Sequence, residues 1–242
     1  MPGAWLILPT FNEAENIEPL VRAVLPQLEA AGVPHTVLIV DDSSPDGTGE
    51  IADRLAAELE PVRVLHRPRK EGLGRAYLAG FGVALDEGAD LVLEMDSDFS
   101  HDPADLPRLI AAAQEADLVL GSRYVEGGGV ENWGLVRRTL SRGGSWYART
   151  VLRVPVRDLT GGFKCFRREV LEALALHDVH ADGYGFQIEL TYRTIKAGFK
   201  VLELPITFRE RRMGNSKMTA RIALEAVWKV PALRLRGRVK KA

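Results

Sequence analysis

Short apolar runs alternate with longer segments of helical periodicity through the first half of the chain. Five runs are as continuously hydrophobic as buried parallel strands, over residues 5–8, 36–40, 62–66, 91–95 and 118–121. Between them, apolar side chains recur with helical spacing over residues 13–31, 46–60, 73–88 and 103–116. Asp46 and Asp102 stand where N-caps are expected, and Pro103 follows Asp102 at a first helical position. This repeat predicts an α/β fold with an open, mostly parallel central sheet flanked by helices.

The regular alternation ends near residue 122. Residues 122–134, SRYVEGGGVENWG, are rich in glycine and polar side chains and are typical of a mobile loop. Beyond them we expect a helix over about 134–152, a short strand over about 162–167, a helix over about 183–197 and a strand over about 199–209. No linker, repeat or low-complexity block divides the chain, so we expect one domain over residues 1–242.

Composition excludes several classes of protein. Of the 242 residues 46% are hydrophobic, which is enough for a substantial core, and a net charge of −1 gives no general attraction to nucleic acid. The single cysteine, Cys165, forms no internal disulfide and has no Cys or His neighbour for zinc, so we expect a buried apolar residue in a reducing cytosol. No window approaches the ~20 uncharged apolar residues of a membrane span, and the N-terminus lacks the basic region of a secretory signal.

Polar and acidic residues follow four of the predicted strands. In chain order, the segments after these strands are PTFNEAEN, DDSSPDGT, DSDFSH and GSRY. Ligands of open α/β sheets bind beyond the carboxyl ends of the strands, which lie at one edge when the strands are parallel. The sequence therefore predicts a binding site to which four loops contribute.

The segment LVLEMDSDFSH, residues 91–101, ends a predicted buried strand with three acids, Glu94, Asp96 and Asp98. Such a cluster needs a neutralising partner, because like charges repel strongly in a low dielectric. In an extended chain the side chains of Asp96 and Asp98 project to the same side, with Ser100 next in phase. These oxygen ligands suit Mg²⁺ or Mn²⁺, which would keep positions open for water and phosphate oxygens.

A second interpretation of these acids stays open. They could cap the helix near Asp102 or pair with Arg123, although capping needs only one acid. His101, alone beside a polar turn, is more typical of a loop residue than of a metal ligand.

Residues 41–48, DDSSPDGT, have the composition of a capped turn between a strand and a helix. Two consecutive aspartates exceed what a cap requires, so the alternative is hydrogen bonding to the ring N–H or ribose hydroxyls of a nucleoside. Residues 70–80, KEGLGRAYLAG, do not fit the dinucleotide-binding fingerprint, because no glycine follows Gly74 at the required spacing and the segment follows the third strand. The GLGRA stretch instead predicts the start of a helix that packs close to the sheet.

Basic residues concentrate in the second half. The segment RERRMGNSK, residues 209–217, is either a solvated basic loop or a clamp for a pyrophosphate, because guanidinium groups bind phosphate oxygens in pairs. Its cations, and others expected on the same half, are Arg209, Arg211, Arg212, Lys217, Arg123, Arg137, Arg138 and Arg142. An acidic, metal-binding half opposite a basic half predicts that a cation neutralises the acids and that the phosphates of a nucleotide complete its coordination.

Seven segments together resemble one enzyme family: LPTFNEAENI, VDDSSPDGT, MDSDFSHDP, GSRY, DLTGGFKCF, FQIELTYR and ERRMGNSKM. They are similar to motifs of the dolichyl- or polyprenyl-phosphate mannosyltransferases, which are inverting enzymes with the GT-A nucleotide-diphospho-sugar transferase fold. The resemblance runs from about residue 5 to 220. Many sugar transferases share the double aspartate, whereas LTGGFK together with GNSKM narrows the likeness to enzymes with polyprenyl-phosphate acceptors.

The resemblance implies transfer of mannose from GDP-mannose to a polyprenyl (dolichyl-type) monophosphate, with inversion and with Mg²⁺ or Mn²⁺ as cofactor. It implies a nucleotide-binding half over about 5–121 and an acceptor and phosphate half over 122–218. The nucleotide contacts would be Pro9, Phe11, Glu13, Val40 and Asp42. The metal ligands would be Asp96 and Asp98, with Ser97 and Ser100 nearby. Donor phosphate or mannose contacts would be Arg123, Arg211 and Lys217, and the acceptor phosphate contact Arg137.

Three positions depart from the family pattern. Phe11 stands where tyrosine is common, which retains ring stacking but loses a hydroxyl contact. Ser100 stands where some relatives use glutamine, and Gly185 stands where lysine is frequent.

The chemistry needs no protein base. The second pKa of a phosphate monoester is near about 6, so the acceptor is largely a dianion at neutral pH and is already nucleophilic. Two other functions remain open at this point. One is a sibling enzyme that uses UDP-glucose or another donor, and the other is a non-catalytic subunit that binds nucleotide sugar and recruits a membrane partner.

The C-terminal segment, residues 219–242, is amphipathic and basic, with no acid beyond Glu225. This pattern suits an interfacial helix at the cytoplasmic face of a membrane, where anionic headgroups attract basic residues. We therefore expect a cytoplasmic protein with peripheral membrane contact, and a separate anchoring subunit is a further option. The alternative is a core helix with a frayed tail, because Pro231 interrupts the pattern.

Overall fold

The computed structural model describes residues 3–179, 181, 183–210 and 230–235. Its centre is a seven-stranded sheet in the order β3-β2-β1-β4-β7-β5-β8, in which β7 alone is antiparallel to its neighbours. The strands are β1 (Ala4–Thr10), β2 (His35–Asp41), β3 (Val62–His66), β4 (Leu91–Glu94), β5 (Leu118–Ser122), β7 (Lys164–Arg167) and β8 (Val201–Pro205). The predicted α/β fold with a mostly parallel sheet is confirmed.

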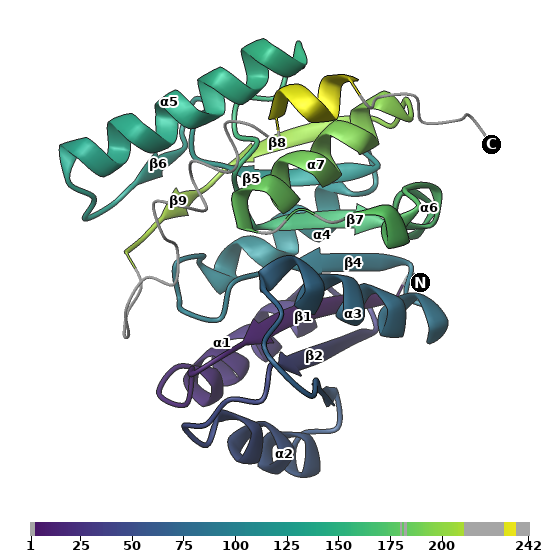
Figure 1. Ribbon diagram of the computed structural model, residues 1–242. Helices are drawn as coiled ribbons and strands as arrows, with labels where there is room; N and C mark the ends of the chain where they lie inside the picture. The colour runs from purple at the N-terminus through teal and green to yellow at the C-terminus, as the bar shows by residue number, and fades with distance from the viewer. Residues whose placement is uncertain (1–2, 180, 182, 211–229, 236–242) are drawn as a thin grey trace.

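Helices cover both faces of this sheet (Figure 1). One apolar core lies under α3 (Leu73–Asp86) and α7 (Gly183–Lys196), and the other under α1 (Ile17–Ala30), α2 (Thr48–Glu58) and α4 (Leu106–Ala112). Alternate residues of each strand enter opposite cores: in β1, Ile7 packs with the first and Leu6 and Leu8 with the second. This burial on both faces explains why the sequences of most strands are apolar at consecutive positions.

The start of α3 packs as the GLGRA segment predicted. A Cβ added at Gly80 would lie 2.5 Å from Ile7 Cγ2, and one at Gly74 would lie 2.9 Å from the carbonyl oxygen of Ala181. Both glycines therefore allow the close approach of α3 to the sheet and to the segment before α7. The cap at Asp102 is also present, since its carboxylate accepts a hydrogen bond of 3.0 Å from the Ala104 N–H at η1 (Pro103–Asp105).

The mobile loop predicted over residues 122–134 is partly wrong. It contains β6 (Gly129–Val130), which pairs in parallel with β9 (Thr207–Phe208). The predicted strand over 199–209 is accordingly divided into β8 and β9, since Ile206 N–H bonds instead to the carbonyl oxygen of Ser122. The pairing joins segments far apart in sequence, so neither segment carries a local signal for it.

The later helices are α5 (Leu135–Leu152), α6 (Arg168–Ala173), η2 (Leu176–Asp178) and α7, and residues 230–235 are also helical. Of these, α6 and η2 had no counterpart among the predicted elements. Cys165 is fully buried on β7, as expected, and burial raises the pKa of its thiol to about 12. Among the described residues, none of the helices combines the length and apolarity that a bilayer crossing requires.

Candidate active site

The polar loops at the strand ends surround one cavity of about 260 Å³. Because β7 is antiparallel, its first residue, Lys164, lies at the same edge of the sheet as the last residue of β4, and the two residues before β7 also reach this edge. Ten residues proposed from the sequence line the cavity: Pro9, Phe11, Glu13, Asp42, Asp96, Ser97, Asp98, Ser100, Arg123 and Arg137. The fold therefore brings acidic and basic groups from both halves of the chain to one site.

One proposed residue that the structure describes does not line this cavity, and two others cannot be placed. The side chain of Val40 is fully buried and packs with the core beneath α3, so it is not accessible to a nucleotide. Arg211 and Lys217 lie outside the described residues.

The two consecutive aspartates have different surroundings. The Asp41 carboxylate accepts hydrogen bonds from Thr10 Oγ1 at 3.0 Å and from the backbone N–H of Ser44 at 3.1 Å, so it orders the loop. Asp42 lines the cavity and pairs with Arg67, whose Nη1 lies 2.5 Å from Asp42 Oδ1. Burial raises the pKa of Asp42 despite the opposing charge of Arg67. Of the pair, Asp42 is therefore the one positioned to meet a ligand.

The loops after β1 and β2 are hydrogen-bonded to each other. The Glu13 N–H donates to Thr48 Oγ1 at 2.9 Å, and the Ala14 N–H donates to Asp46 Oδ2 at 3.1 Å. Asp46 also accepts from the Thr48 N–H at the start of α2, although Gly47 occupies the N-cap position itself. These bonds fix the wall of the cavity that carries Phe11 and Glu13, and the ammonium of Lys70 lies 3.8 Å from the centre of the Phe11 ring.

Asp96 and Asp98 line the cavity from a turn after β4. The extended geometry assumed for this pair is wrong, because the chain turns at residues 97 and 98 and Phe99 has a φ of 61°. The turn is held by Ser97 Oγ, which donates to the carbonyl oxygen of Pro9 at 2.9 Å, and by Asp98 Oδ1, which accepts from the Ser100 N–H at 3.0 Å. Both carboxylates still belong to one site because the turn, rather than strand pleating, places them there.

Two polar atoms at this cavity are buried without a hydrogen-bond partner among the described residues. They are Ser100 Oγ and Trp133 Nε1, and both residues line the cavity. An unsatisfied buried polar atom costs about 1–3 kcal/mol, so a ligand that supplied oxygen atoms would recover that energy. The two carboxylates and the Ser100 hydroxyl form an all-oxygen donor set, which fits a hard divalent cation with open coordination positions.

Arg123 does not pair with Asp96 or Asp98, which removes one alternative for these acids. Its Nε and Nη2 each donate at 2.7 Å to a different oxygen of Asp158, and Nη2 also donates to Thr160 Oγ1 at 2.8 Å. Burial disfavours the charge on Arg123, but the facing Asp158 carboxylate outweighs it and raises the arginine pKa. The guanidinium is thus rigidly held where it borders the cavity.

Arg137 borders the cavity from α5. It forms an ion pair of 2.9 Å with Glu210, and its guanidinium lies 4.3 Å from the centre of the Trp133 ring. The Arg137 side chain is 42% exposed, so the Glu210 contact is a surface ion pair that an entering anion can replace at small cost.

Glu94 does not line the cavity, so the grouping of Glu94 with Asp96 and Asp98 predicted from the sequence is wrong. It is fully buried on β4 opposite Lys164, with 3.9 Å between Glu94 Oε2 and Lys164 Nζ. Burial raises the pKa of Glu94 to about 7 and lowers that of Lys164 to about 8. Lys164 Nζ also donates to the backbone carbonyl oxygen of Gln187 at 3.0 Å, which supports a residue that lines the cavity. A lysine therefore accompanies Glu94, which separates this acid from Asp96 and Asp98 at the cavity.

His101 also lies outside the cavity lining. Its ring is buried, stacks on Phe163 at a centroid distance of 4.9 Å and contacts Phe208 edge-on at 5.2 Å. Burial lowers its pKa to about 4. This histidine is therefore a neutral packing residue, in line with the expectation that it is not a ligand.

Sequence reasoning missed several residues that line the cavity: Lys70, Trp133, Thr160, Gly162, Tyr184, Gln187 and Phe208. Thr160 and Gln187 lie in two of the segments that carry the family resemblance, DLTGGFKCF and FQIELTYR. Their residue types alone did not indicate a role at the site. Phe208 reaches the site through the β6–β9 pairing, which has no local signal.

Comparison with known proteins agrees with this geometry. The family model for glycosyl transferase family 2 matches residues 5–175. An undecaprenyl-phosphate mannosyltransferase from Micrococcus luteus is 48% identical over 221 residues, which cover 91% of this chain and 89% of that protein. A polyprenol monophosphomannose synthase from Mycolicibacterium smegmatis is 48% identical over 98% of this chain and 89% of its own length.

Solved structures show the same fold at low sequence identity. Glucosyl-3-phosphoglycerate synthase from Mycobacterium tuberculosis, in complex with phosphoglyceric acid, superposes with a TM-score of 0.70 at 20% identity, covering 96% of this chain and 80% of that one. The same enzyme in complex with Mn²⁺, UDP and glucosyl-3-phosphoglycerate also gives a TM-score of 0.70 at 20% identity over the same shares of the two chains.

The order of the strands and the likeness to these solved structures show the GT-A fold, with the cavity at the carboxyl edge of its sheet. The chain belongs to glycosyl transferase family 2, and it is a glycosyltransferase.

Proposed function

We propose that the protein transfers mannose from GDP-mannose to a polyprenyl monophosphate with inversion, giving polyprenyl-phosphate mannose. The observation that carries this proposal is the 48% identity, over nearly the whole chain, to two proteins named for mannose transfer to polyprenyl phosphates. The cavity supports it chemically, because carboxylates on one side and arginines on the other suit two phosphate-bearing substrates that meet there.

The donor would occupy the side of the cavity formed by the loops after β1, β2 and β4. Phe11 offers a ring face for stacking and Asp42 a carboxylate for hydrogen bonding, while Trp133 Nε1, beside Arg137, offers a buried donor to hydroxyl or phosphate oxygens. Lys70 adds a cation at the edge of this side. Arg211 and Lys217, from the segment GNSK and its neighbours, remain proposed donor contacts on the strength of the family resemblance.

Asp96, Asp98 and Ser100 would hold a divalent metal ion, Mg²⁺ or Mn²⁺. The fit rests on the all-oxygen donor set and on Ser100 Oγ, which is buried without a partner among the described residues. When bound, such an ion supplies charge that stabilises the departing diphosphate. Among the described residues no third carboxylate or histidine joins the group, which leaves coordination positions for phosphate oxygens.

In the reaction we propose, an oxygen of the lipid phosphate attacks the anomeric carbon of mannose. The bond from that carbon to the diphosphate oxygen breaks as the new bond forms, and GDP leaves with the electron pair. No proton has to move, because the acceptor phosphate is already a dianion near neutral pH. Arg137 would hold the acceptor phosphate in line, and Arg123, oriented by Asp158, would contact the donor's phosphates or mannose.

A donor screen tests this proposal. We expect radiolabelled GDP-mannose to yield a chloroform-soluble product with a short polyprenyl phosphate in the presence of Mg²⁺ or Mn²⁺, and UDP-glucose and UDP-GlcNAc to yield at least tenfold less. A product formed only from UDP-glucose would show that UDP-glucose is the donor, and the protein would still be a glycosyltransferase. No product from any donor, despite tight binding of nucleotide sugar, would favour a binding subunit and contradict the proposal.

A further inference from the structure

Helix α5 leaves most of its surface uncovered. Of its described side chains only Ser145, Ala148 and Leu152 are buried. Three of its large apolar residues are exposed: Leu135 is 80% exposed, Leu140 71% and Trp146 67%. Exposed leucines and a tryptophan on one helix are unusual for a surface that meets only water.

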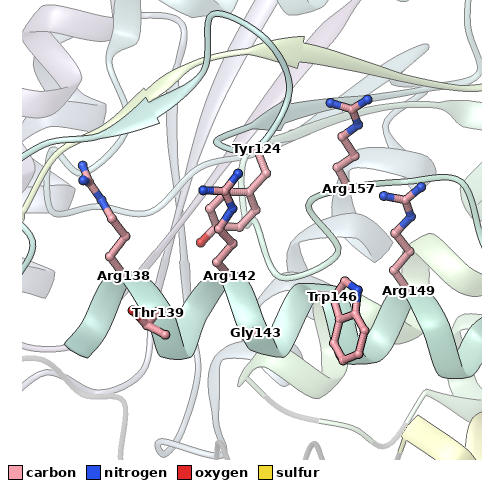
Figure 2. Close-up of a pocket in the computed structure, with 8 residues that line it drawn as sticks. All are labelled: Tyr124, Arg138, Thr139, Arg142, Gly143, Trp146, Arg149 and Arg157. Atoms are coloured by element: carbon pink, nitrogen blue, oxygen red, sulfur yellow. The ribbon is translucent and has the colours of Figure 1, made fainter. Parts of the chain in front are cut away.

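The charge around this helix has a single sign. Residues 132–157 contain six arginines and no acid. Four of these arginines, Arg138, Arg142, Arg149 and Arg157, line a groove of about 530 Å³ together with Tyr124, Thr139, Gly143 and Trp146. Figure 2 shows Arg138, Arg142 and Arg149 projecting from the same side of α5, with Arg157 and Tyr124 on chain segments across from the helix. Within the described part of the chain, no carboxylate forms an ion pair with any of the four.

We propose that the outer face of α5 docks on the membrane and that this arginine groove binds the phosphate of an anionic phospholipid headgroup. Guanidinium groups bind phosphate oxygens in pairs and are weakly hydrated, so several around one groove suit a phosphodiester. Tryptophan and leucine beside them suit the boundary between headgroups and acyl chains. The basic groups of this helix therefore match the headgroup layer of a membrane, and its apolar groups match the acyl chains beneath.

This groove is separate from the active-site cavity, since the two share no lining residue. They are nevertheless adjacent in the chain, because Arg137 lines the cavity and Arg138 lines the groove. Docking of α5 would place the arginine side of the cavity close to the headgroup layer, where a lipid phosphate is presented. The inference rests on the proposed function only for the benefit that docking brings to the reaction, and the binding test uses neither substrate.

Vesicle flotation with the full-length protein tests the proposal. The vesicles are phosphatidylcholine alone or with phosphatidylglycerol, and contain neither polyprenyl phosphate nor nucleotide sugar. We expect strong binding only to the anionic vesicles at low salt. Each basic residue near such a surface contributes about fivefold in affinity, so Arg142→Gln with Arg149→Gln should weaken binding by roughly 30-fold. Trp146→Ala should weaken binding to anionic vesicles by about tenfold. Added salt should change this loss less than it changes the loss caused by the two arginine substitutions.

A charge-matched control separates the groove from net charge. Arg54→Gln with Arg63→Gln removes the same two charges from α2 and β3, where the side chains are 52% and 51% exposed. This pair should bind vesicles within about twofold of wild type. Wild type that fails to bind anionic vesicles, groove variants that bind like wild type, or an equal loss in the distant pair would each overturn the proposal. Transfer to a short, water-soluble acceptor should be unchanged in Trp146→Ala, so that failure of docking and failure of the proposed function are distinguishable.

Discussion

Replacing Asp96 and Asp98 together with asparagine is expected to lower the transfer rate by at least about 1,000-fold. A metal ion that stabilises a leaving diphosphate contributes several kcal/mol, and each 1.4 kcal/mol corresponds to about tenfold in rate. Asparagine retains the size of aspartate but removes both charges from the proposed donor set. The measurement is the initial rate of mannosyl-lipid formation with Mg²⁺ or Mn²⁺, accompanied by circular dichroism and thermal unfolding to show that the fold is intact.

Asp102 provides a matched control on the same loop. It caps η1 and forms an ion pair with Arg209 at 2.8 Å, but it does not line the cavity. Asp102→Asn should retain the cap and change the rate by no more than a few fold. A double variant at Asp96 and Asp98 that works within tenfold of wild type, or wild-type activity that persists in excess chelator, would remove the metal from the mechanism.

Asp158→Asn is expected to lower the free energy of unfolding by about 3–5 kcal/mol, because it leaves the Arg123 guanidinium buried without a counter-charge. The side chains of this pair are 4% and 0% exposed, and the bond is bidentate. Arg123→Met should also be destabilising, while the double variant Arg123→Met with Asp158→Asn should lose less than the sum of the two. Chemical denaturation of the four proteins gives the coupling directly.

The acid dependence of stability offers a second test of the same pair. Burial disfavours the charge on Asp158, but the Arg123 guanidinium outweighs it and holds the carboxyl pKa below its ordinary value of 3.8. The contribution of this group is therefore present above pH 3.8 and is lost as the pH falls through the folded value. The stability gap between wild type and Asp158→Asn should narrow in acid. As a comparison, Glu58→Gln at the exposed pair with Arg22, where the side chains are 46% and 44% exposed, should lower the free energy of unfolding far less than Asp158→Asn does. A similar cost at both pairs would contradict the assigned burial.

Local patterns predicted the first half of the fold well because most of its strands are buried on both faces, the edge strand β3 excepted, and because helices alternate with the strands along the chain. The run LVLEM carries enough apolar character to define β4, and the polar residues after it mark the edge of the sheet. The second half was harder for a physical reason. The antiparallel insertion of β7 between β4 and β5, and the pairing of β6 with β9, depend on contacts between distant segments. Such pairing is selected by the assembled sheet rather than by the segments themselves.

The candidate site shows the same division. Residue type and spacing were enough to find Asp96 and Asp98, because charged side chains at the end of a buried strand require a partner. They were not enough to separate these two from Glu94, since only the antiparallel β7 places Lys164 opposite that acid. Asp158, which fixes Arg123, escaped notice for a similar reason: its role depends on burial against a residue from another strand end.

The central claim is that one cavity joins a sugar nucleotide to a lipid phosphate by a single displacement. The most direct test is the anomeric configuration of the product made from GDP-mannose and a short polyprenyl phosphate, read from the one-bond carbon–hydrogen coupling at the anomeric centre. GDP-mannose carries its sugar in the α configuration, so direct attack by the phosphate predicts a β-linked mannosyl phosphodiester. An α-linked product, or release of free mannose with no mannosyl lipid, would contradict the account.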